Sequence, residues 1–282
     1  MTPIKHLPGN SKTRPHYAAS RILIALCFFG TVSISSVQAE DFPLIPHGEI
    51  ATIDAQTAKT QTQNDNQGIG ISITSAWYSC ATQRYRHGVL GDDIEGGCLL
   101  ATDANGKRYE LQLSDQYVFE DTTPRLADMD DDGLADIITI RSDRSLGAAI
   151  AIYSLRDGDL TEIASTPPIG LSNRWLAPAG IADFNNDGIN DIAYVQTPHI
   201  GGILRFWSIT SDGFIELGQR RGYSNHSIGS TRVSISRVDD FDGDGVADIA
   251  LPDQGGGSTV IVTLHPTLQE LERQAFKLTF FD

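Results

Sequence analysis

Basic residues are scarce in this chain. Its 282 residues include 21 Lys and Arg against 36 Asp and Glu, which gives a formal net charge of −15. A protein of that sign repels the phosphates of nucleic acids and anionic lipid headgroups, so we expect no nucleic-acid partner. The acidic residues are also concentrated, because three short segments together with Asp239 contain 13 of the 36. The charge therefore indicates local cation sites more than an acidic surface.

The sequence also lacks an apolar run long enough to cross a membrane. The run from Ile22 to about Ile34 is too short to span a bilayer. Four basic residues precede it, between Lys5 and Arg21, and it ends at Val37-Gln38-Ala39, a small-residue cleavage pattern. We therefore expect residues 1–39 to be a signal peptide, with cleavage near Ala39 and a periplasmic or secreted product not inserted in the membrane. Cleavage removes four basic and no acidic residues, so the mature net charge is 17 minus 36, or −19.

Cysteine is rare as well. Of three cysteines, only Cys80 and Cys98 remain after the expected cleavage. In an oxidising compartment a lone pair of cysteines commonly forms a disulfide, and we predict one here. Two buried thiols are the alternative.

Three segments of the same ten-residue pattern begin at Asp128, Asp183 and Asp240. Each has side-chain oxygens at positions 1, 3, 5 and 9 and a glycine at position 6, where the backbone must turn sharply. Ca²⁺ prefers such oxygen ligands, so we expect about three Ca²⁺ ions per chain. Turns rich in Asp and Asn that only cap strands are the alternative. The predicted ligands are Asp128, Asp130, Asp132 and Asp136 in loop one, Asp183, Asn185, Asp187 and Asp191 in loop two, and Asp240, Asp242, Asp244 and Asp248 in loop three.

These acidic loops lack the glutamate that an EF-hand needs at position 12, where Thr139, Tyr194 and Leu251 stand instead. A short apolar, strand-like run follows each loop, as in Asp136-Ile-Ile-Thr-Ile140. The loops are therefore expected to join strands. Asn185 leaves loop two with one carboxylate fewer, which predicts weaker binding there.

The loops recur with a period of 55 and then 57 residues. A period near fifty indicates a solenoid, an array or a propeller. Asp157-Gly158 and Asp212-Gly213 are hairpin signals in the same register, and glycines recur between loop and hairpin. Each unit is thus predicted to be strand, acidic loop, strand, glycine-marked loop, strand, Asp-Gly turn and strand.

A fourth, degenerate unit is expected upstream, where Gly96-Gly97 and Asn105-Gly106 repeat the second half of the pattern. Its acidic loop is expected to be missing, because residues 76–85 contain no carboxylate. We therefore predict an all-β chain, a β-propeller of about four blades of four antiparallel strands. The predicted parts are a flexible N-terminal segment at 40–67 and blades at 68–116, 117–170, 171–221 and 222–282, with the last outer strand near 275–280.

The three acidic segments resemble FG-GAP repeats of the VCBS type, which are known from the propeller of integrin α-subunits. The resemblance covers roughly residues 117–282. It implies a β-propeller with Ca²⁺ bound between the first two strands of a blade, and a role in adhesion, recognition or scaffolding.

Strand direction separates the loops into two groups. In an up-and-down blade the acidic loops and Asp-Gly turns share one face, while connections from second to third strand and from blade to blade share the other. That second face, here called the opposite rim, is predicted to bind a protein or carbohydrate ligand. The candidate ligand-binding residues are His87, Arg174, His199, Asn225 and His226. Each is also explained by loop hydrogen bonding, turn capping or packing between blades.

An enzyme is the competing class, either a secreted hydrolase or a metal-dependent enzyme that uses His and Arg on this rim. Ser224, His226 and Asp92 could form a triad, but the sequence has no Gly-x-Ser-x-Gly elbow. His87, His199 and His226 could hold zinc, yet no pair has the usual close spacing. A structural module whose partner covers the rim is a third option. We expect a binding module rather than an enzyme.

Overall fold

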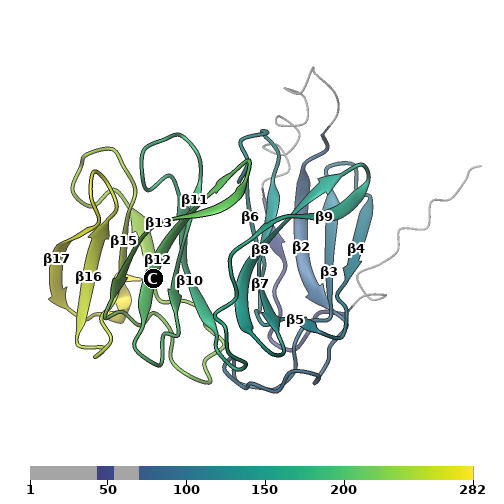
Figure 1. Ribbon diagram of the computed structural model, residues 1–282, viewed down its shortest axis with the longest axis horizontal. Helices are drawn as coiled ribbons and strands as arrows, with labels where there is room; N and C mark the ends of the chain where they lie inside the picture. Colours follow the sequence, from purple (N-terminus) through teal and green to yellow (C-terminus); the bar gives the residue numbers. More distant parts are fainter. Residues whose placement is uncertain (1–42, 54–69, 282) are drawn as a thin grey trace, which may run out of the picture. The chain divides into compact units, whose positions relative to one another are not determined.

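The computed structural model describes residues 43–53 and 70–281. The predicted signal peptide lies outside the described residues, as does the segment 54–69. All strands are antiparallel and fall into four sheets (Figure 1). No helix among the described residues is long and apolar enough to cross a membrane.

The first sheet runs β1 (Ala51–Thr52), β2 (Ile73–Ser79), β3 (Cys98–Asp103) and β4 (Arg108–Gln112). The second runs β7 (Asp136–Asp143), β8 (Gly147–Arg156) and β9 (Asp159–Ser165), with β5 (Tyr117–Phe119) and β6 (Arg125–Ala127) both paired to β7. The third runs β10 (Leu176–Ala182), β11 (Asp191–Gln196), β12 (Ile203–Thr210) and β13 (Gly213–Arg221). The fourth runs β14 (Arg237–Asp239), β15 (Asp248–Pro252), β16 (Ser258–Thr263) and β17 (Gln269–Ala275).

The middle strands explain why these sheets form. Strand β8 is rich in small and β-branched apolar residues, and its side chains are buried from Gly147 to Tyr153. A strand buried on both faces must lie in a sheet covered on both faces. Strand β9, at the outer edge, instead alternates exposed and buried residues. The pattern confirms the predicted all-β class and is consistent with propeller blades.

Apolar clusters join neighbouring sheets at three boundaries. Tyr78, Phe119 and Tyr153 meet between the first and second sheets, with successive ring centroids 5.0 and 6.0 Å apart. A cluster around Trp175 joins the second and third, and Phe184 with Phe206 belongs to the cluster between the third and fourth. Among the described residues no such cluster joins the fourth sheet to the first. Loops make contact there, as where Gly229 N donates to Val89 O over 2.9 Å.

Three details differ from the prediction. Strand β1 lies inside the segment 40–67 that was expected to be flexible, where Ala51 and Thr52 pair with β2. The connection equivalent to the acidic loops is therefore 53–72 and not 76–85. Residues 76–85 form the end of β2 and the start of the β2–β3 loop. The last outer strand is β17 at Gln269–Ala275 rather than 275–280, because its pairing with β16 begins at Gln269, immediately after a turn at 264–268.

The acidic loops and the opposite rim

The three acidic loops connect β6 to β7, β10 to β11 and β14 to β15, so each leads from a strand at the edge of its sheet to the next strand inward, as predicted. Each is closed by the same hydrogen bond, from the glycine amide at position 6 to the Asp carboxylate at position 1, over 2.8 to 2.9 Å. Glycine is needed because its φ is positive, between 81° and 91°, in all three loops. The bonded pairs are Gly133 with Asp128, Gly188 with Asp183, and Gly245 with Asp240.

The Asp at position 9 begins the second strand of each sheet and is buried, with at most 1 % of its surface exposed. One oxygen accepts the backbone N–H of position 2 over 2.9 to 3.1 Å. The other oxygen, Oδ1, is buried without a hydrogen bond in Asp191 and Asp248, as is Oδ1 of Asp128. An unpaired buried carboxylate oxygen is costly unless a cation meets it. The donor set therefore fits a hard, oxygen-seeking ion.

Burial also disfavours the negative charge of these groups. It raises the pKa of Asp136 to about 7, although Ser154 and the Met129 amide bond to that carboxylate. It raises the pKa of Asp191 to about 6, although the nearby Ser208 hydroxyl opposes the shift. A bound cation would remove this penalty, because it favours the charged carboxylate.

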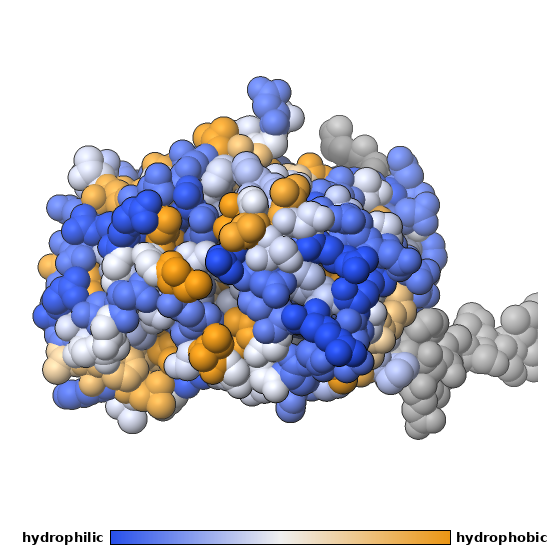
Figure 2. Space-filling model, turned by 60° about the horizontal axis from the view of Figure 1, so that its bottom comes forward, coloured by the Kyte–Doolittle hydropathy of each residue, from blue (hydrophilic) through white to orange (hydrophobic). Residues whose placement is uncertain are grey.

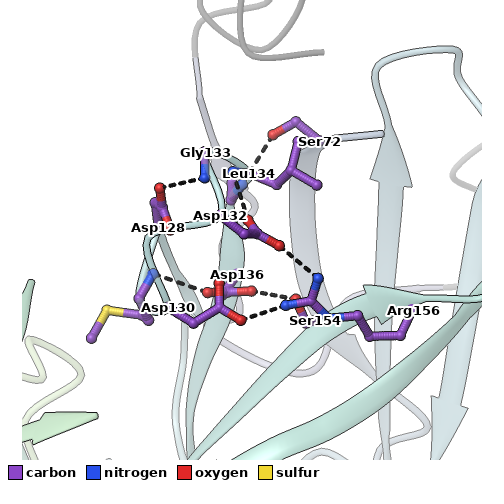
Figure 3. Close-up of polar contacts among 11 residues, drawn as sticks. Ser72, Asp128, Asp130, Asp132, Gly133, Leu134, Asp136, Ser154 and Arg156 are labelled. Atoms are coloured by element: carbon purple, nitrogen blue, oxygen red, sulfur yellow. Dashed lines mark hydrogen bonds and ion pairs between the residues drawn. The ribbon is translucent and has the colours of Figure 1, made fainter. Parts of the chain in front are cut away.

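A basic side chain of the protein pairs with the carboxylates of loop one. Arg156, at the end of β8, forms ion pairs with Asp130 and with Asp132, the latter at 2.6 Å (Figure 3). Ser154 donates to Asp136 in the same site. The carboxylates of Asp128, Asp130 and Asp136 still converge closely enough for one ion. Arg156 lies 24 residues beyond Asp132, outside the ten-residue pattern, so the sequence did not mark it as part of the site.

The other two loops differ in their ligands. Asp240, Asp242 and Asp248 converge in loop three as the Asp triad does in loop one. In loop two the amide of Asn185 donates to Asp187 Oδ2 over 2.9 Å, which occupies an oxygen that an ion could use. The acidic triads of loops one and three can thus bind metal ions.

The predicted ligand-binding residues all lie on loops of the opposite rim, at the bottom of Figure 1. His87, Arg174 and His199 line one pocket of about 430 Å³, which we call the rim pocket. They come from the β2–β3, β9–β10 and β11–β12 connections. The predicted assignment of these loops to one face thus brings together three residues that are far apart in sequence.

The imidazole of His87 is oriented by a buried carboxylate. Its Nδ1 bonds to Oε1 of Glu120, and Ser142 Oγ donates to the other oxygen of the same carboxylate. Glu120 has no exposed surface, and burial raises the pKa of its carboxyl group, while His87 and Ser142 oppose the rise. The Trp175 indole donates to the main-chain oxygen of Glu120 over 2.9 Å. Nothing in the local sequence marked Glu120, which is 33 residues from His87.

His199 and His226 form a second pair, with Nε2 of His199 and Nδ1 of His226 2.9 Å apart. The other nitrogen of His226 lies 3.0 Å from Ser230 O, so it must donate there. His226 Nδ1 is then an acceptor, and His199 Nε2 donates to it. Burial lowers the pKa of His226 to about 4, which keeps the ring neutral.

Asn225 and His226 do not line the rim pocket and are buried. Asn225 Nδ2 donates to Pro178 O over 2.8 Å and to Ser234 Oγ over 3.1 Å. Trp175 is 2 % exposed and packs its ring 4.7 Å from that of His226. These residues support the pocket and do not form its wall, apart from Trp175.

The sites considered for an enzyme do not assemble. Ser224 Oγ bonds to the main-chain oxygen of His226 rather than to its ring, and Asp92 lies beside His47. Within residues 43–53 and 70–281, no group of three possible metal ligands includes a rim histidine.

Comparison with known proteins identifies residues 128–194 as an FG-GAP-like repeat. This range starts at loop one and ends in β11, and it confirms the resemblance of the acidic segments to FG-GAP repeats. No curated protein matches the chain.

Among solved structures, the chain is similar to three rhamnogalacturonan lyases, each at 12 % identity and a TM-score of 0.39. For the family PL11 lyase of Bacillus licheniformis the match covers 68 % of this chain and 44 % of the enzyme. For the lyases YesW and YesX it covers 66 % and 68 % of this chain and 37 % and 42 % of those enzymes. The chain thus spans less than half the length of each, and a likeness this low carries no information about activity.

Proposed function

We propose that this chain is an exported recognition module whose blades are stabilised by Ca²⁺ in the three acidic loops and whose opposite rim binds a protein or carbohydrate partner. The observation that carries the calcium part is the buried, unpaired Oδ1 of Asp128, Asp191 and Asp248, one in each loop. In each loop one carboxylate oxygen, at position 1 in loop one and at position 9 in loops two and three, is buried without a hydrogen bond, and a cation would satisfy it.

Export is supported by two features. The N-terminal pattern of residues 1–39 is that of a signal peptide. Cys80 and Cys98 form a disulfide, as predicted, with the Cα atoms 5.3 Å apart. Disulfides persist mainly in oxidising compartments such as the periplasm or the extracellular space.

The proposal that the opposite rim binds a partner rests on the rim pocket and on the contacts that hold its histidines in place. His87 is fixed by a fully buried carboxylate, and His199 by His226 and the ring of Trp175. Side chains oriented in this way lose little entropy when a ligand binds. Within the part of the chain that the structure describes, no comparable geometry supports the hydrolytic or zinc alternatives.

The experiment that tests this function is affinity capture from the exported proteome with Ca²⁺ present. The bait is the wild-type protein or a His87→Ala, His199→Ala double variant, and an Asp212→Ala variant in a distant hairpin serves as control. We expect the double variant to lose partners that the wild type and Asp212→Ala both capture. An identical set of partners from all three baits would refute the rim proposal.

A further inference from the structure

None of the described residues that line the rim pocket is acidic, although the chain has 36 acidic and 21 basic residues. Its wall includes instead the guanidinium of Arg174 and the imidazoles of His87 and His199, and burial lowers the pKa of His199. A cavity lined by basic side chains in an otherwise acidic protein attracts anionic ligands. The wall therefore favours an anionic group.

Arg174 is the group best placed to bind that anion. Its guanidinium forms no ion pair within the described residues, and Nη1 only bonds to Asn173 O, over 2.9 Å. Several arginines of the sheets form ion pairs instead, such as Arg141 with Glu162 and Arg205 with Glu216. An unpaired guanidinium retains the planar donors that bind a carboxylate bidentately.

The backbone of Arg174 is nevertheless held firmly. Its carbonyl accepts the amide of Ala148 over 2.9 Å. The contact requires glycine at position 147, because a Cβ there would lie 2.8 Å from Arg174 O and 2.4 Å from Leu171 O. The side chain thus extends from a fixed point in the same pocket wall as His87, whose Nδ1 bonds to Glu120.

The rest of the wall is aliphatic. Ile200 and Ile228 line the pocket and are 64 % and 74 % exposed, which makes them the most exposed large apolar side chains among the described residues. Figure 2 brings this side of the molecule forward and shows separate apolar patches among polar ones. Exposed aliphatic side chains beside a cationic group favour a ligand that has both an anion and an apolar part.

We propose that the rim pocket binds the free C-terminal carboxylate of a peptide whose last residue is aliphatic, with Arg174 on the carboxylate and Ile200 and Ile228 around the side chain. The proposal rests on the opposite rim being the binding face. An acidic sugar fits less well, because sugars stack on exposed aromatic rings and Trp175 is 2 % exposed. A volume of about 430 Å³ accommodates a group of about one or two residues.

The test is a calorimetric titration of the full mature protein with N-acetyl-Ala-Leu, either with a free carboxylate or as the C-terminal amide. We expect the acid to bind and the amide to bind at least tenfold more weakly. Arg174→Gln should weaken binding of the acid by a similar factor. Arg144→Gln, which changes another unpaired arginine of the same rim outside the pocket, should stay within twofold of wild type.

Equal binding of acid and amide, or no effect of Arg174→Gln, would overturn the proposal, as would an oligouronate that binds where the dipeptide does not. Melting temperatures and Ca²⁺ binding of each variant show whether it is folded. If the dipeptide fails while the His87→Ala, His199→Ala variant still loses its captured partners, this inference alone is wrong and the rim remains the binding face.

Discussion

Asn190 in loop two donates a hydrogen bond from Nδ2 to the main-chain oxygen of Asp128 in loop one, over 2.8 Å. The first ligand residue of one site is thereby connected to the neighbouring site. Because an ion that orders one loop also orders the other through this bond, Ca²⁺ binding to loop one should raise the Ca²⁺ affinity of loop two, and the reverse.

We expect Asn190→Ala to lower the free energy of unfolding by about 1 kcal/mol, the usual net value of one hydrogen bond. It should also reduce the cooperativity between the first two Ca²⁺ ions that bind. Urea unfolding and a calcium titration of both proteins measure the two effects. Unchanged stability and unchanged cooperativity would show that the contact does not couple the loops.

Arg156 should compete with Ca²⁺ for loop one, because it pairs with Asp130 and Asp132. Arg156→Gln is expected to raise the Ca²⁺ affinity of that loop several-fold and to lower the melting temperature of the calcium-free protein. Arg205→Gln, which breaks a surface ion pair with Glu216 away from the acidic loops, is the control. If both variants bind Ca²⁺ as the wild type does, Arg156 is no competitor.

Glu95 makes stability depend on pH. Burial, with Glu120 as the next contribution, raises its pKa from 4.5 to about 9, and the residue is 3 % exposed. The folded state therefore keeps a proton that the unfolded state releases above about pH 4.5. The stabilising contribution is fully present below that pH and is lost progressively as the pH rises toward about 9.

Glu95→Gln removes this titration. Because the wild type loses roughly 1.4 kcal/mol for each pH unit above about 4.5, the stability of the variant relative to wild type should rise from pH 4 to pH 8 by on the order of 5 kcal/mol. Urea unfolding at the two pH values measures the difference. A difference in the free energy of unfolding between wild type and variant that is the same at pH 4 and pH 8 would contradict the raised pKa of Glu95.

Much of this architecture was predictable because it repeats. Three copies of one ten-residue pattern identified the acidic loops, their position between strands and the two faces of the blades. Strands β1 and β5 escaped prediction because two or three residues show no periodicity, and their pairing partners decide their structure. Contacts such as Glu120 with His87 and Arg156 with Asp130 depend on side chains 33 and 26 residues apart, which no local pattern reveals.

The disulfide should stabilise the first sheet. Cys80 and Cys98 are separated by 18 residues, and closing a loop of that size is worth roughly 3 kcal/mol on a chain-entropy model. Cys80→Ser, Cys98→Ser should therefore lower the free energy of unfolding by about this amount. Chemical denaturation measures it, and mass analysis after alkylation of the unreduced wild type should show neither cysteine labelled.

Equilibrium dialysis with radioactive calcium tests most directly whether the acidic loops bind Ca²⁺. The wild type should bind three ions per chain, and single replacements of Asp128, Asp183 or Asp240 by Ala should each remove one, with the loop-two ion the weakest. Asp212→Ala should still bind three. A wild-type protein that remains folded and binds no calcium at millimolar concentration would contradict the account.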